Sequence, residues 1–229
     1  MIQKEFVRLR ERLSDPLLTA LTVMLAVLMF VIAPLQAVGV VGAHYFGFAF
    51  GLMLVVAVFV VSGSVMALTA TLFAFSLVVV ATILRLRQPS AIDIYLDASA
   101  WLIAGLTLAI VVARAVFAPG KVNFHRIVGA ILLYLDIGLI FVALFCLVAL
   151  LDPSAFTGLP LLSDNLLAIA GNLIYFSFAT LTSVGYGDIV PLHPFARSLA
   201  NIEAIIGQLY PATLLARLVT LELEHRRGS

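Results

Sequence analysis

The sequence predicts an all-α membrane protein in which six transmembrane helices are present and a re-entrant segment lies between helices five and six. Of the 229 residues, 63% are hydrophobic and only 11% are charged, and the mean hydropathy is +1.19. Soluble domains are about half apolar and about a quarter charged, so lipid is the expected solvent. Several apolar stretches are long enough to cross about 30 Å of hydrocarbon at about 1.5 Å per residue. The lipid bilayer is therefore an expected partner, and a net charge of +1 gives no indication of nucleic acid binding.

The N-terminal half predicts a surface segment followed by a four-helix membrane domain. Residues 1–16 alternate charged and apolar side chains, which suits an interfacial segment at the membrane surface. A continuous apolar block over residues 46–84 is too long for one helix, and Ser62-Gly63-Ser64 is where we expect it to fold into two. The four predicted spans cover about residues 17–38, 46–61, 65–84 and 94–117, and the domain extends over residues 17–120.

The C-terminal part, residues 121–229, predicts two further helices with an unusual segment between them. The fifth helix covers about residues 127–151 and is stopped by Asp152-Pro153, and the sixth covers about residues 195–221. The segment between them is too irregular to span the membrane and too apolar for an ordinary loop.

Basic residues in the short loops predict that both termini are cytoplasmic. Those on the predicted inner side are Lys4, Arg8, Arg10, Arg12, Lys121, Arg126, Arg217, Arg226 and Arg227. Six spans satisfy this distribution, although Arg85 and Arg87, after the third span, then fall on the outer side. The first apolar run is longer than a signal-peptide core, so we expect a retained helix. A compact multi-pass chain without a targeting peptide points to a bacterial inner (cell) membrane.

A glycine-containing motif lies in the segment before the sixth helix, and it reads Thr182-Ser183-Val184-Gly185-Tyr186-Gly187-Asp188. A dehydrated potassium ion needs oxygens in place of its water shell, and successive backbone carbonyls supply them when alternate residues adopt a conformation that glycine tolerates. Gly185 and Gly187 lie at that alternation. Val184 and Tyr186 then point their side chains away from the axis. The Thr182 hydroxyl can complete the innermost ring, and because one chain has one such strand, four chains around an axis are implied.

The stretch from Thr180 to Asp188 resembles the signature of the potassium channel superfamily, and the resemblance covers the helix–loop–helix unit at about residues 125–221. It implies a homotetramer that conducts potassium passively, with a re-entrant pore helix and a selectivity filter. The implied filter residues are Thr182, Ser183, Val184, Gly185, Tyr186 and Gly187, with K⁺ held at Thr182 to Tyr186 and Asp188 at the outer mouth. Potassium ions are the only bound species expected, with no other cofactor. Ser183 stands where many members have a second threonine, and it keeps the hydroxyl.

The number of helices before the motif is similar to that of the voltage-gated relatives, but the gating arginines are absent. A sensor needs several arginines at three-residue spacing, because each charge moved is worth about 2.3 kcal/mol per 100 mV. The fourth predicted helix has one, Arg114. We therefore expect weak or absent voltage dependence.

The predicted pore helix, residues 172–181, differs from the family pattern behind the motif. Where many members carry tryptophans or a glutamate that brace the filter's aspartate, this chain has Tyr175, Phe176 and Ala179. Only the Tyr175 hydroxyl is able to reach Asp188, so the filter is expected to be loosely braced. Ordinary packing of the two aromatic rings is the alternative interpretation.

The sixth helix contains residues that suggest a gate. Gly207 and Pro211 both loosen a helix and predict a hinge, although close packing explains such residues in membrane helices equally well. Gln208 is expected near the cavity lining, where its amide would face a hydrated ion.

Two acidic residues, Asp136 and Glu203, are predicted to lie inside membrane helices, where an unpaired charge is expensive. We expect Glu203 to hydrogen-bond to the back of the pore helix in a structural role, with pH sensing as the alternative. Asp136 is expected to pair with Arg114.

Three other functions are compatible with a membrane protein of this kind. A subunit of a potassium uptake system is one, although such filters usually have a single glycine. A non-conducting regulatory subunit is another, but it has no reason to keep a full filter. An enzyme is the least expected, because the sequence has no metal-ligand cluster or phosphate loop and Ser183 has no nearby base.

Overall fold

The structure, a computed structural model, describes residues 18–37, 51, 55, 65–87, 91–117, 124–160 and 166–227. After a first helix over residues 18–37, the elements are α4 (Val65–Arg87), α5 (Ala91–Val116), α6 (Phe124–Leu151), β1 (Phe156–Thr157), α7 (Leu166–Leu181), β2 (Val190–Pro191) and α8 (Pro194–Arg227). The predicted all-α class is confirmed. The predicted second helix, residues 46–61, lies outside the described residues except for two positions, so six helices remain a prediction.

Four of the described helices are long and apolar enough to cross a membrane: Leu18–Leu35, Val65–Leu84, Ile92–Val116 and Phe124–Leu151. They match four of the predicted spans, and the chain is a multi-pass membrane protein. Helix α8 is long enough at 34 residues, but its polar residues, Asn201, Glu203 and Gln208 among them, lower its hydropathy. Helix α7 begins six residues before the predicted start at Asn172, and its 16 residues extend about 24 Å, less than the hydrocarbon thickness.

The first helix changes its hydrogen-bond register in the middle. Residues 18–27 are α-helical, Leu28–Ile32 form a π-helical turn called η1, and α2 (Ala33–Ala37) completes the helix. The N–H of Ala33 donates to the carbonyl of Leu28, a five-residue step. Pro34 follows directly, and because proline has no N–H and clashes with the carbonyl four residues earlier, a wider turn before it relieves the crowding.

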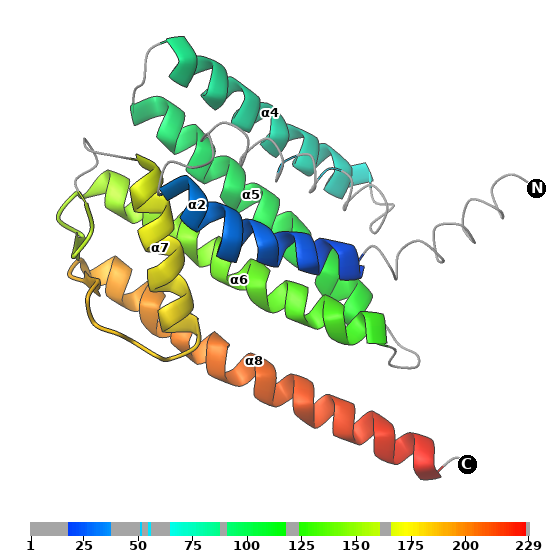
Figure 1. Ribbon diagram of the computed structural model, residues 1–229. Coiled ribbons are helices and arrows are strands. Elements are labelled where there is room, and N and C mark those ends of the chain that lie inside the picture. Colours follow the sequence, from blue (N-terminus) through cyan, green and yellow to red (C-terminus); the bar gives the residue numbers. More distant parts are fainter. Residues whose placement is uncertain are drawn as a thin grey trace, which may run out of the picture.

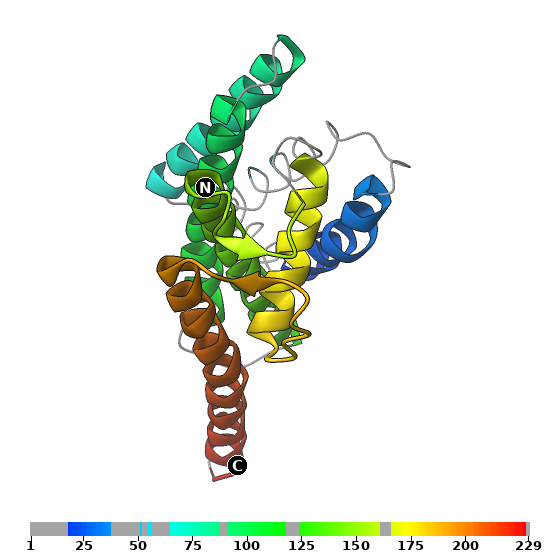
Figure 2. The same ribbon diagram turned by 90° about the vertical axis from the view of Figure 1, so that its left-hand side faces the viewer.

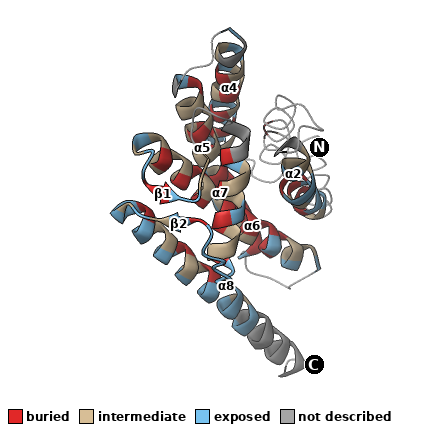
Figure 3. Ribbon diagram, turned by 60° about the vertical axis from the view of Figure 1, so that its left-hand side comes forward, coloured by how far each residue is buried: buried red, intermediate tan, exposed pale blue. Residues whose placement is uncertain are grey.

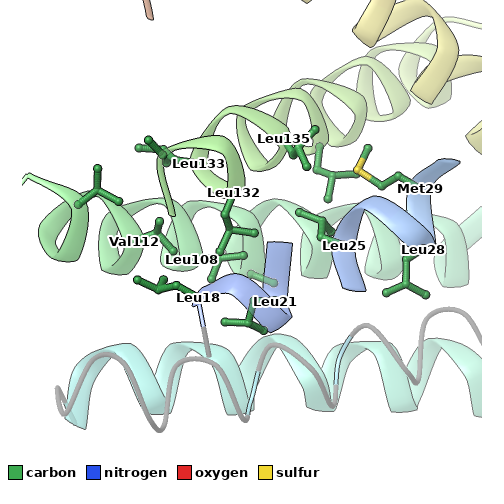
Figure 4. Packing of buried hydrophobic residues seen from close by; sticks show 14 of the residues in the cluster. Leu18, Leu21, Leu25, Leu28, Met29, Leu108, Val112, Leu132, Leu133 and Leu135 are labelled. Carbon is green, nitrogen blue, oxygen red and sulfur yellow. The ribbon is translucent and has the colours of Figure 1, made fainter. Parts of the chain in front are cut away.

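Helix α6 is the centre of the fold (Figure 1). Helix α5 packs against both α4 and α6, and α6 also packs against α7 and α8. One face of the first helix, with leucines at positions 18, 21, 25 and 28, packs on α5 and α6 at residues such as Leu108 and Leu132 (Figure 4). Figure 3 shows that the buried positions gather along α6 and α7, whereas exposed positions follow the segment after α7 and much of α8.

Contacts near the helix ends establish which ends lie on the same side. The Tyr95 hydroxyl donates to the Leu150 carbonyl at 3.0 Å, so the start of α5 lies beside the end of α6. At the opposite end, Thr19 Oγ1 is 3.0 Å from His125 Nδ1. This arrangement agrees with the alternation expected from the basic residues, and it places Arg87, at the end of α4, on the side opposite His125. Which side is cytoplasmic stays a prediction.

A second apolar cluster connects α6 with α7 and the two strands. The rings of Phe145, Phe156 and Phe176 pack edge to face, with centroids 5.0–5.9 Å apart. Strand β1 pairs antiparallel with β2, as Figure 2 shows, and thereby ties the segment after α6 to the segment before α8. At the end of α6, the hydroxyl and the backbone N–H of Ser154 both donate to Asp152 and lower the pKa of that carboxyl.

Candidate functional site

The predicted motif forms an extended loop, residues 182–188, which we call the signature loop. The first N–H groups of the loop donate hydrogen bonds to carbonyls at the end of α7. The N–H of Ser183 donates to the Thr180 carbonyl at 2.9 Å, and the N–H groups of Val184 and Gly185 both donate to Ala179 at 2.8 and 3.1 Å. These bonds satisfy carbonyls that a helix end leaves without partners. The loop therefore starts from a fixed position at the C-terminal end of α7.

Backbone conformation alternates along the signature loop. Ser183, Gly185 and Gly187 have positive φ values of 58°, 55° and 81°, and the residues between them do not. The left-handed conformation was expected at the two glycines, and it is found there. Ser183 was not expected to share it, because a residue with a Cβ loses about 1–2 kcal/mol in this region. Three left-handed residues at a spacing of two is the backbone pattern that aims successive carbonyls toward one side.

The carbonyl groups of the signature loop are left free. Among the residues that the structure describes, none of the carbonyls of residues 182–187 accepts a hydrogen bond. All seven residues of the loop are exposed in the single chain. Because buried or lipid-facing carbonyls are costly without a partner, these oxygens require water, an ion or a further chain beside them.

The outer end of the loop is held at two points. The Tyr175 hydroxyl on α7 donates to Asp188 Oδ1 at 3.0 Å, which is the contact expected from the sequence. The Tyr175 ring also stacks on Tyr186, with centroids 5.6 Å apart and planes within 13°. Gly158 has a φ of 84°, and a Cβ there would lie 2.0 Å from the Asp188 carbonyl oxygen. Gly158 was missed by the sequence analysis, and its only signal was a glycine in the turn before Leu159-Pro160.

Phe176 does not share the role suggested for it beside Tyr175. Neighbouring residues on a helix point in directions about 100° apart, and the Phe176 ring lies in the second apolar cluster with Phe145 and Phe156. It therefore fixes α7 against α6 and β1, as the packing interpretation held. Of these two aromatic residues, only Tyr175 forms a hydrogen bond to the signature loop.

The two hydroxyls at the inner end of the loop have different partners. Thr182 Oγ1 donates to the Phe178 carbonyl at 2.6 Å, so its proton is used within α7 while its lone pairs stay available. Ser183 Oγ accepts from Gln208 Nε2 on α8 at 2.8 Å. Gln208 was expected near a cavity lining. It is exposed, and its amide also connects α8 to a loop residue with a left-handed backbone.

Gly207 marks the closest approach of α8 to α7. A Cβ at Gly207 would lie 1.8 Å from the Leu181 carbonyl oxygen, which explains why glycine is required there. Helix α8 continues through Pro211, which has no N–H to offer the Gly207 carbonyl. Close packing accounts for Gly207 in this conformation, and the hinge at Gly207 and Pro211 stays a prediction.

The two buried acids have different surroundings. Glu203 Oε1 is 2.5 Å from Ser177 Oγ on α7, so the expected bond to the back of this helix is confirmed. Ser177 itself was missed, although a lone serine in an apolar helix was a signal. The predicted Asp136–Arg114 pair is wrong: Asp136 is fully buried without a hydrogen-bond partner among the described residues, whereas Arg114 is exposed. Asp136 faces Gly105, and Arg114 lies nine residues, or about 13 Å, farther along α5.

Curated proteins are similar to part of this chain. Protein LctB of Bacillus caldotenax is 38% identical over 64 residues, which is 28% of this chain and 46% of that protein. Protein LctB of Geobacillus stearothermophilus is 39% identical over 57 residues, 25% of this chain and 42% of that protein. The chain thus spans less than half the length of these curated relatives, and no solved structure matches it.

A family match covers the helices that carry the signature loop. Residues 129–223 match the family described as "Ion channel". This range runs from α6 through α7 and the loop into α8, and so contains every contact described above between α7, the loop and α8. It supports the resemblance to the potassium channel superfamily over residues 129–223.

Proposed function

We propose that this chain is one of four identical subunits of a potassium-selective channel and that residues 182–187 form its selectivity filter. The observation that carries the proposal is the row of unpartnered carbonyls on a backbone that is left-handed at residues 183, 185 and 187. Four such rows around an axis would replace the hydration shell of K⁺ with carbonyl oxygens. The C-terminal end of α7, which carries partial negative charge, would favour a cation in the cavity beneath.

The need for further copies follows from what a single chain leaves exposed. Non-helical backbone at membrane depth is tolerated only inside protein or beside water, and the signature loop is open on one side, with Tyr186 70% exposed. Helix α8 also presents exposed apolar residues seven positions apart, at Phe195, Ile202 and Leu209. Symmetry-related chains around an axis would cover both surfaces.

We further propose that the subunit lies in a bacterial inner membrane with both termini in the cytoplasm, and that voltage has little effect on it. The conduction path would pass Asp188 at the outer mouth and Gln208 at the inner end. The predicted N-terminal helices would resemble a sensor domain in number only, because α5 carries a single arginine, Arg114.

Potassium flux through purified protein in liposomes tests the proposed function. We expect flux that strongly favours potassium over sodium and that barium blocks, with little dependence on voltage. Equal sodium and potassium flux would contradict the filter assignment. Complete absence of flux over a range of pH and voltage would contradict passive conduction by this chain alone and favour a regulatory subunit.

A Tyr175→Phe variant is expected to conduct at first but to lose current faster than the wild type under sustained conduction. The substitution removes the hydroxyl that donates to Asp188 and leaves the stacking on Tyr186 intact. One lost hydrogen bond of this kind is worth about 1 kcal/mol, which corresponds to roughly a fivefold faster decay. Tyr95→Phe, which removes a hydroxyl far from the loop, is the matched control. Unchanged decay in Tyr175→Phe would show that the hydroxyl does not brace the filter.

A further inference from the structure

We propose that Glu203 is a positioning residue that acts as a neutral carboxylic acid, donating through Ser177 to the carbonyl of Gly138 and so holding α7 between α6 and α8. The inference rests on the proposed function, because α7 supports the signature loop. It assigns Glu203 a protonation state and a direction of hydrogen bonding.

Three groups from three helices make up the chain of contacts. Ser177 Oγ on α7 lies 2.9 Å from the Gly138 carbonyl on α6 and 2.5 Å from Glu203 Oε1 on α8. Ser177 and Glu203 have no exposed surface. Gly138 is buried as well, and a Cβ there would lie 2.7 Å from the Phe178 ring, so α6 and α7 cross closely at this point. The contacts are therefore built into a packed crossing of helices.

Counting protons gives the direction of the bonds. A serine hydroxyl has one proton to donate, but Ser177 faces a carbonyl, which only accepts, and a carboxyl. If the carboxyl were ionised, both neighbours would be acceptors and one of the two contacts would have no proton. If Glu203 carries a proton, it donates to Ser177 and Ser177 donates to Gly138, which satisfies both contacts.

The second carboxyl oxygen of Glu203 also indicates that the acid is protonated. Glu203 Oε2 is buried and has no hydrogen-bond partner among the described residues. An ionised carboxylate in this position would place negative charge on an unpartnered oxygen in a membrane interior, which costs far more than leaving a neutral oxygen there. A neutral acid is thus the form that fits the burial and the geometry.

The position of the Glu203–Ser177–Gly138 contacts explains what they do for the signature loop. Ser177 lies one turn before Leu181, at which α7 ends and the signature loop begins. Gly207, which contacts the Leu181 carbonyl, lies one turn after Glu203 on α8. The Glu203–Ser177 bond and the Gly207 contact therefore fix the same end of α7 at two successive turns, and the bond to Gly138 fixes it against α6.

Four variants test the inference by flux. We expect Glu203→Gln to keep the ratio of potassium to sodium flux close to that of the wild type, because its amide N–H₂ donates to Ser177 as the acid does. Glu203→Ala and Ser177→Ala should each lower this ratio about tenfold. The Glu203→Ala/Ser177→Ala double variant should lower it no further than the more severe single variant, since both remove one chain of bonds. Asp136→Asn, which changes the other buried acid and leaves Ser177 untouched, is the control and should keep the wild-type ratio.

Infrared spectroscopy of the wild-type protein provides a readout that does not need conduction. The difference between the wild type and Glu203→Gln should show loss of a carbonyl stretching band of a protonated carboxylic acid. In Ser177→Ala the same band should shift, because the acid has lost its acceptor. Loss of carboxylate bands instead, or a Glu203→Gln variant as unselective as Glu203→Ala, would overturn the inference. A wild type without selective flux would sink the proposed function, while the infrared difference would still decide the state of Glu203.

Discussion

A Gly207→Ala variant is expected to lose both stable assembly and potassium flux. The added Cβ would lie 1.8 Å from the Leu181 carbonyl oxygen and 2.7 Å from its carbon. Overpacking usually costs about 1–3 kcal/mol because side chains move aside. Here the opposing atoms belong to the backbone at the end of α7, so α8 itself must move. We therefore expect the free energy of unfolding to fall by an amount at the upper end of this range, about 3 kcal/mol or more per subunit.

Thermal unfolding and size-exclusion chromatography in detergent measure this effect, with liposome flux as the functional readout. Gly129→Ala is the matched control, because its Cβ would lie 3.0 Å from Val116 Cγ2 and 3.4 Å from Leu18 Cδ1, which are terminal methyl groups of side chains. This control should lower the free energy of unfolding by about 1 kcal/mol and leave flux intact. If Gly207 acted only as a hinge, Gly207→Ala would assemble and melt like the wild type and differ in opening alone.

A Gly185→Ala variant is expected to assemble normally and to lose potassium-selective flux. In the single chain no atom lies within 4 Å of the added Cβ, so the effect is conformational. At a φ of 55°, the left-handed backbone conformation is about 1–2 kcal/mol less favourable for alanine than for glycine. In four subunits that share one pore, the conducting conformation would be destabilised by about 4–8 kcal/mol in total. At about 1.4 kcal/mol per tenfold, the conducting arrangement would become at least roughly a thousandfold rarer.

Flux ratios for potassium and sodium, measured beside a melting curve, separate this result from misfolding. Val190→Ala is the control, because it shortens an exposed side chain in β2, outside the signature loop, at a residue whose φ is not positive. It should retain most of the selective flux. Wild-type selectivity in Gly185→Ala would show that the left-handed conformation at residue 185 is not needed for conduction.

The sequence was informative where length and hydropathy decide the structure. The spans at α4, α5 and α6 follow from uninterrupted apolar runs, and their ends agree with the predictions within a few residues. Helix α7 was predicted to start six residues too late, at Asn172, because Gly171 is a poor helix former. Packing of Ile169 in the second apolar cluster overrides that weak propensity.

Features of the candidate site could be predicted only where the chemistry of a residue allows few alternative conformations or partners. Glycine at 185 and 187 predicted left-handed backbone, and Tyr175 was the one residue of its pair with a hydroxyl for Asp188. The Asp136–Arg114 prediction was wrong because the register of α5 against α6 depends on side-chain packing, which no local pattern reveals. Ser177 and Gly158 were missed for the same reason, since their partners lie on elements distant in the sequence.

The free carbonyls of the signature loop also limit how such a protein is made. A newly inserted subunit cannot hold residues 182–187 against acyl chains, because several unpartnered peptide groups would each cost several kcal/mol. If the chain assembles as proposed, the loop would have to stay hydrated or adopt another conformation until sister subunits arrive. Biogenesis would then couple the maturation of this segment to oligomer formation, and an orphan subunit would expose a non-native loop to quality-control proteases.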